Sequence, residues 1–279
     1  MSISNENCLE LYLDLMKRSL LNTIYSEYEY CDFRPRNKAQ RFLFQQLLMP
    51  QLKKRNAKVI TPYNYDENQR KLGMDWPPTA HSMIGLERMN NIQHCVIEVI
   101  KNNVPGDLIE TGVWRGGATI FMRAILKAYG ITDRKVWVCD SFEGLPKPDE
   151  AKYPQDKGDK HHKSKELAIS LEQVKNNFKK YGLLDNQVIF LKGWFKDTLP
   201  TAPIEQIAVA RLDGDMYEST IEALDNLYHK ILIGGFLIID DYGAVKGCKE
   251  AVHDFRKKHA IKEEIITIDW GGIYWQKLF

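Results

Sequence analysis

The chain has 279 residues, 44% of them hydrophobic, so it is long enough to bury a full core. Its 39 lysines and arginines nearly balance its 37 aspartates and glutamates, and the formal charge of +2 leaves no excess positive field to attract nucleic acid. The five cysteines include no C-x-x-C pair, the apolar run around 231–239 is too short for a membrane span, and no secretion signal is present. We therefore expect a cytoplasmic protein with no membrane partner.

The first 104 residues read as a helical extension that precedes the rest of the fold. Apolar residues recur at helical spacing near the N-terminus, and a second helix is expected over 84–103. Prolines interrupt the pattern between these two helices. We expect residues 1–104 to act as a lid and as an oligomerisation region, so that the protein forms a homodimer or a higher homo-oligomer. The first apolar stripe consists of Leu9, Leu13, Met16, Leu20 and Ile24.

From residue 105 onward, short apolar runs alternate with amphipathic segments, which is typical of a parallel sheet with helices on both faces. We therefore predict an α/β fold with a doubly wound, Rossmann-like sheet over 105–279. The expected strands span 107–111, 135–140, 187–192, 207–213 and 235–240. The expected helices span 119–129, 167–181, 220–232 and 248–259.

Two further segments stand out in this region. The stretch EEIITIDWGGIYWQK predicts an antiparallel β-hairpin that turns at Gly271 and Gly272, and a parallel sheet that ends in such a hairpin is typical of class I methyltransferases. The polar stretch over 152–165 is expected to form a mobile loop or lid. His161 and His162 in this stretch could position a substrate, but exposed histidines flanked by lysines are more often solvated, so we assign them no role.

In doubly wound sheets, ligands bind at the carboxyl ends of the strands. The first strand ends in ETGVWRGG, where Glu110 lies at the strand tip and Gly112 and Gly116 allow the backbone to turn tightly and approach a ligand. An acid in this loop would repel a diphosphate but suits an amino group or a sulfonium, and Asp140 at the next strand end suits a ribose diol. We therefore assign these four residues to S-adenosylmethionine; an ordinary strand-turn-helix with an exposed acid is the alternative.

Four aspartates follow two strands that we expect to be neighbours: Asp213 and Asp215 in RLDGD, and Asp240 and Asp241 in IIDDYG. Two carboxylates about 4 Å apart repel by roughly 4 kcal/mol at an effective dielectric of about 20, so a cation is needed to offset their charge. An all-oxygen cluster favours Mg²⁺, or Mn²⁺ or Ca²⁺, over zinc. Capping of the helices that follow is the alternative explanation for one or two of these residues.

Six segments together resemble the macrocin O-methyltransferase family: ETGVWRGG, CDSFEGLPKPD, LKGWFKDTLP, RLDGDMYEST, IIDDYG and WGGIYW. The resemblance covers most of the chain from about residue 82 onward. Members of the macrocin O-methyltransferase family are bacterial enzymes that use S-adenosylmethionine to methylate sugar hydroxyls on macrolide and aminocoumarin antibiotics. The resemblance implies that Asp213, Asp240 and Asp241 bind Mg²⁺ and that Asp215 is the general base. The cofactor residues that it implies are Ser82, Met83, Glu110, Gly112, Trp114, Asp140, Ser141, Gly144, Gly193 and Trp194.

The leading hypothesis is therefore a Mg²⁺-dependent methyl transfer from S-adenosylmethionine to a hydroxyl of a sugar moiety on a natural product or glycan. A catechol-type O-methyltransferase that acts on a phenolic diol is the alternative. An NAD-dependent oxidoreductase is disfavoured because the glycines lack the G-x-G-x-x-G spacing of a dinucleotide site. A non-catalytic partner protein is disfavoured because four converging aspartates without a ligand would be costly.

Overall fold

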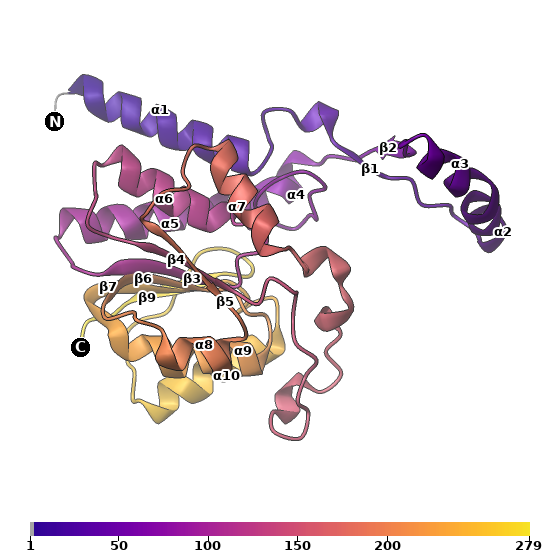
Figure 1. Ribbon diagram of the computed structural model, residues 1–279. Coiled ribbons are helices and arrows are strands. Elements are labelled where there is room, and N and C mark those ends of the chain that lie inside the picture. The colour runs from indigo at the N-terminus through magenta and orange to yellow at the C-terminus, as the bar shows by residue number, and fades with distance from the viewer. Residues whose placement is uncertain (1–2) are drawn as a thin grey trace.

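The computed structural model describes residues 3–279, and its main feature is a seven-stranded sheet in the order β5-β4-β3-β6-β7-β9-β8 (Figure 1). The strands from β3 to β7 are parallel, and the last two strands are antiparallel to their neighbours. The chain winds outward in both directions from β3 and β6, which is the point where doubly wound sheets bind ligands. The strands are β3 (Asp107–Thr111), β4 (Val136–Asp140), β5 (Val188–Lys192), β6 (Ile207–Leu212), β7 (Ile231–Ile239), β8 (Ile266–Thr267) and β9 (Ile273–Gln276).

Helices cover both faces of this sheet (Figure 1). One face carries α1 (Ile3–Leu20), α5 (Gly85–Lys101), α6 (Gly117–Ala128) and α7 (Leu171–Lys180). The other carries α8 (Phe195–Thr198), α9 (Tyr217–Leu227) and α10 (Lys246–Lys258). Successive strand residues enter separate buried apolar clusters, Leu108 on the first face and Ile109 on the second, which explains the continuous apolar runs of the sequence. Within residues 3–279, no helix is both long and apolar enough to cross a membrane.

The predicted α/β fold, doubly wound sheet and C-terminal hairpin are confirmed. The first four predicted strands agree with the structure to within one residue at either end. The fifth begins at Ile231 rather than at 235, and the preceding helix ends at Leu227 rather than at 232. The apolar residues after this helix fit a helical spacing, but they pair with β6 across a register shift, and Gly234 adopts a φ of +87° there. Periodicity alone does not distinguish a helix from a strand in so short an apolar run.

The N-terminal extension is only partly helical. Leu13, Met16 and Leu20 of the predicted stripe are buried, and α1 packs against α6, whereas Ile24 lies beyond the end of α1. The stretch between the predicted helices contains an antiparallel pair, β1 (Tyr30–Asp32) and β2 (Ile60–Pro62), which we did not predict. This pair and the helices beyond it project away from the body of the protein in Figure 1, and we call residues 30–62 the arm. The remaining α-helices are α2 (Lys38–Leu43), α3 (Met49–Lys54) and, after the arm, α4 (Glu67–Leu72).

A buried arginine fixes the base of the arm to the body. Arg70 of α4 is fully buried, and its guanidinium forms ion pairs of 2.6 Å with both Glu29 and Asp75. The same guanidinium donates to the carbonyl oxygen of Leu21, just after α1, at 2.7 Å. Three segments on either side of the arm therefore meet at one side chain.

Replacement of Arg70 by methionine should lower the free energy of unfolding by about 3–5 kcal/mol, because two buried carboxylates would lose their partner. Arg18→Ala removes an exposed pair with Asp14 and should cost no more than about 1 kcal/mol, so it serves as the control. Urea titration followed by circular dichroism measures both variants. Equal stability of the two variants would contradict the anchoring role of Arg70.

Candidate active site

A cavity of about 570 Å³ opens at the carboxyl ends of the central strands. It is lined by fourteen of the fifteen residues that the sequence assigned to a site, and the exception is Gly116. Gly116 precedes α6 with a φ of +85°, and a side chain there would meet Val174, so its role is to let the backbone turn beneath the site. The lining residues among those assigned are Ser82, Met83, Glu110, Gly112, Trp114, Asp140, Ser141, Gly144, Gly193, Trp194, Asp213, Asp215, Asp240 and Asp241.

Gly112 allows the loops after β3 and β6 to cross. Its φ is +81°, and a Cβ atom at this position would lie 1.6 Å from the carbonyl oxygen of Asp213. The amide of Asp213 donates to the carbonyl oxygen of Thr111, so the two loops are also hydrogen-bonded to each other. The loop after β3, which carries predicted cofactor residues, is therefore in direct contact with Asp213, and only glycine at 112 permits this contact.

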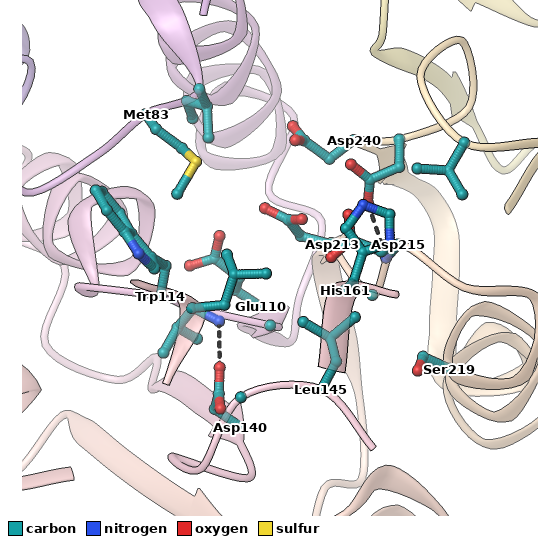
Figure 2. Close-up of a pocket in the computed structure, with 18 of the residues that line it drawn as sticks. Met83, Glu110, Trp114, Asp140, Leu145, His161, Asp213, Asp215, Ser219 and Asp240 are labelled. Atoms are coloured by element: carbon teal, nitrogen blue, oxygen red, sulfur yellow. Dashed lines mark hydrogen bonds between the residues drawn. The ribbon is translucent and has the colours of Figure 1, made fainter. Parts of the chain in front are cut away.

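The Asp140 carboxylate shapes the loops that follow β3 and β4. It accepts hydrogen bonds from the backbone N–H groups of Val113 at 2.8 Å and Phe142 at 2.6 Å (Figure 2 draws one of these two bonds). Ser141 donates through its Oγ to the carbonyl oxygen of Gly144 at 2.7 Å, which closes the next turn. Burial raises the pKa of Asp140, and the hydrogen bonds to its carboxylate oppose that shift.

Arg211 is fully buried at the centre of the site and binds three acids. Its guanidinium donates to Glu110, to Asp240 and, at 2.8 Å, to Asp213. Burial raises the pKa of Glu110 to about 8, although the charge of Arg211 acts in the opposite direction. Arg211 was not predicted as a site residue. The signal was present, because an arginine inside the apolar run IAVARL must be paired if that run is a buried strand.

Arg88 of α5 binds the other oxygen of Asp240. Its Nη1 lies 2.7 Å from Asp240 Oδ2, and its Nε lies 2.8 Å from Asp269 Oδ2 in the hairpin turn. Trp270 lies beside this guanidinium, 5.2 Å from ring centre to Cζ, and donates through its indole to the carbonyl oxygen of Leu72. Both carboxylate oxygens of Asp240 therefore have an arginine partner.

Asp213, Asp215 and Asp241 form the cluster that could hold a metal ion. Each offers one carboxylate oxygen, and these oxygens all lie within 4.8 Å of one another. Burial, the largest cause in each case, raises the pKa of Asp213 to about 7, that of Asp215 to about 6, and that of Asp241 well above its usual range. The structure thus brings together Asp215 and two of the three predicted ligands, while Asp240 lies among the arginines.

Figure 2 shows that the cavity also contains a histidine to which we had assigned no role. His161 lies in a short helical turn, His161–Lys163, of the stretch predicted as a lid, and its ring is drawn beside Asp213 and Asp215. His162 is not among the lining residues. Sequence spacing gives no sign of which histidine faces inward, because the loop has no regular period.

Apolar side chains from separate parts of the chain complete the cavity. The N-terminal extension contributes residues just after α4, and the hairpin turn contributes Trp270. None of these was predicted individually. They include Met74, Trp76, Leu145, Pro146, Leu167 and Phe195.

The chain is similar to known proteins over most of its length. The model of the family described as Macrocin-O-methyltransferase (TylF) matches residues 9–277. The demethyldecarbamoylnovobiocin O-methyltransferase of Streptomyces niveus is 49% identical over 269 residues, which cover 96% of this chain and 93% of that protein. An 8-demethyl-8-(2,3-dimethoxy-alpha-L-rhamnosyl)-tetracenomycin-C 4'-O-methyltransferase of Streptomyces olivaceus is 47% identical over 272 residues, covering 97% and 94%.

Solved structures of methyltransferases have the same fold. The structure of the O-methyltransferase NovP matches with a TM-score of 0.82 and 48% identity over 97% of this chain and 100% of that chain. The calicheamicin methyltransferase CalS11, at 16% identity and a TM-score of 0.54 over 88% and 95%, shares the fold alone. The predicted class I methyltransferase fold is therefore confirmed. The chain is an O-methyltransferase and belongs to the macrocin O-methyltransferase family.

Proposed function

We propose that this protein transfers a methyl group from S-adenosylmethionine to a hydroxyl of a sugar-bearing small molecule, with a divalent cation, Mg²⁺, at the aspartate cluster. The observation that carries the proposal is that three clustered carboxylates share one cavity with the acidic ends of β3 and β4. The names of the relatives support the acceptor class, since one of them acts at a 4' hydroxyl of a rhamnosyl-bearing compound.

The cavity fits the proposed methyl donor. Glu110 Oε2 is buried and makes no hydrogen bond within residues 3–279, so it is available to accept from a donor group of a ligand. Glu110 and Asp140 lie at the ends of adjacent parallel strands, on the side of the cavity that Met83 and Trp114 line in Figure 2. When bound, S-adenosylmethionine supplies an electrophilic methyl group on a positively charged sulfur, and acids at both strand ends suit a cationic ligand with a diol.

The aspartate cluster fits a hard cation. Its ligand atoms are carboxylate oxygens, which Mg²⁺ prefers, and repulsion among three buried carboxylates favours a cation there. We propose Asp213 and Asp241 as ligands. Asp240 remains a proposed ligand as well, because each carboxylate oxygen has a second lone pair besides the one used by an arginine. A cation bound to a hydroxyl lowers the pKa of that hydroxyl.

Asp215 is proposed as the general base. It follows the turn at Gly214 with a φ of +57°, and its amide donates to Asp241 Oδ2 at 3.0 Å, which holds the residue against the cluster. In the reaction the hydroxyl oxygen bonds to the methyl carbon, the carbon–sulfur bond breaks with its electron pair left on sulfur, and Asp215 takes the hydroxyl proton. General-base assistance of this kind is worth about 10² to 10⁴ in rate.

The division of the chain into a core over 105–279 and an extension over 1–104 that acts as a lid and an oligomerisation region remains a proposal. It is supported by the cavity residues 73–76, which the extension contributes, and by the arm. The arm exposes several large apolar side chains, which is typical of a surface that another copy of the chain covers. They are Tyr30, Phe33, Phe42, Leu43, Leu47, Leu48 and Ile60.

The purified protein should methylate glycosides in the presence of S-adenosylmethionine and Mg²⁺, and a chelator should abolish turnover that added Mg²⁺ then restores. Mass spectrometry of a panel of glycosides and catechols, each incubated with and without chelator, measures this. Turnover that persists after chelation would exclude the cation from the reaction. Turnover of phenolic diols alone would favour the catechol-type alternative.

Asp215→Asn should lower kcat by about 10² to 10⁴ while calorimetry shows unchanged binding of S-adenosylhomocysteine, because the base is lost and the cofactor site is kept. The wild-type kcat/KM should fall towards low pH, since burial raises the pKa of Asp215 to about 6 before a cation binds and only the ionised form accepts a proton. A bound cation shifts this limb of the profile to lower pH. The variant should lack the limb, and an Asp215→Asn protein with the wild-type rate would remove the residue as base.

Light scattering at micromolar concentration should give the mass of a dimer or a larger oligomer for the wild type. The double variant Phe42→Asp and Leu47→Asp should give a smaller mass, because two charges on the exposed apolar face of the arm oppose its burial. Gln46→Asp adds a charge at an exposed polar position of the same turn and is the control. A monomeric wild type would refute the role of the arm in assembly.

A further inference from the structure

The stretch predicted as a lid is fastened next to the aspartate cluster. Asp156 is buried, and its two carboxylate oxygens accept from the backbone N–H groups of Tyr217 at 2.7 Å and Glu218 at 2.9 Å. These are the first residues of α9, which begins directly after the segment that contains Asp213 and Asp215. At its other end the stretch is held by Trp114, whose indole donates to the carbonyl oxygen of Glu166 at 2.9 Å.

Between these two attachments, Asp159 fixes the orientation of His161. Asp159 Oδ1 accepts from the backbone N–H of His161 at 2.8 Å, and Asp159 Oδ2 lies 2.6 Å from the ring Nδ1. An ionised carboxylate can only accept, so Nδ1 carries the hydrogen and Nε2 is the ring atom left for another partner. The side chain of Asp159 is mostly buried, at 12% exposed, which favours a fixed rather than a fluctuating pair.

His161 faces the part of the cavity where an acceptor must bind. It lines the cavity and lies beside Asp215 in Figure 2, on the side away from Glu110 and Trp114. The His161 and Asp215 side chains are also close enough to interact electrostatically. Mg²⁺ prefers oxygen ligands, so the imidazole nitrogen is available for an organic ligand.

We propose that His161 is an acceptor-binding residue, whose Nε2 hydrogen-bonds a hydroxyl of the sugar beside Asp215, and that Asp159 is a positioning residue that acts through His161. This inference rests on the proposed function, since it assumes an acceptor with free hydroxyls in the cavity. A neutral imidazole nitrogen accepts from O–H, and hydroxyls are the donors that a sugar ring offers. His161 would therefore favour acceptors that have a free hydroxyl within reach of Nε2.

His161→Ala should raise the acceptor KM and lower kcat/KM about tenfold, the worth of roughly one hydrogen bond. Binding of S-adenosylhomocysteine, measured by calorimetry, should be unchanged. Added imidazole should restore part of the lost activity, which it would not do if the side chain only supported the loop. His162→Ala replaces the adjacent histidine, which does not line the cavity, and should behave as the wild type.

Asp159→Asn should give a smaller loss in kcat/KM, and the double variant with His161→Ala should be no worse than His161→Ala alone, because Asp159 acts only through the ring. Additive losses would overturn the positioning role. Wild-type kinetics in His161→Ala, or a loss of cofactor affinity with no imidazole rescue, would overturn the acceptor-binding role while leaving the proposed function intact. If the wild type methylates no glycoside, the proposed function and this inference fall together.

Discussion

The site depends on one buried guanidinium. Arg211 lies at the centre of the sheet and binds the acids at the ends of three neighbouring parallel strands, β3, β6 and β7. An ion of this kind is costly to bury alone, and removing it would leave Glu110 and Asp213 without their arginine and Asp240 with Arg88 alone, a loss of several kcal/mol. Because one rigid group contacts both the proposed cofactor acid and a proposed metal ligand, the two halves of the site are held in a fixed relation.

A second arginine extends this network to the C-terminal hairpin. Arg88 joins Asp240 to Asp269, so α5 and the C-terminal hairpin meet at the edge of the site. Asp269 in turn accepts from the amides of Gly271 and Gly272, which shapes the turn predicted from these glycines. The hairpin therefore does more than complete the sheet: its turn holds the partner of an active-site acid, and its Trp270 lines the cavity.

The parts of the chain that differ most from the predictions are the arm and the stretch over 152–165. The arm contains a strand pair where breaks were expected, and the stretch over 152–165 is fastened by Asp156 and carries an inward-facing histidine. Neither feature has a local periodicity, since loops follow no repeat. Buried charged side chains, Arg70 and Asp156, help to fasten this otherwise irregular backbone to the body.

The sequence by itself determined the parallel sheet, the hairpin and the acids at the strand ends, because apolar runs, turn glycines and the residue after a strand are local features. In the structure, all but one of the fifteen residues assigned from the sequence line one cavity. Only the tertiary structure decided how the four aspartates divide. Asp215 joins Asp213 and Asp241 in the cluster, and Asp240 is held by Arg88, a residue 152 positions earlier in the chain. Such a partner is set by the packing of α5 against the sheet, and no spacing within the motif encodes it.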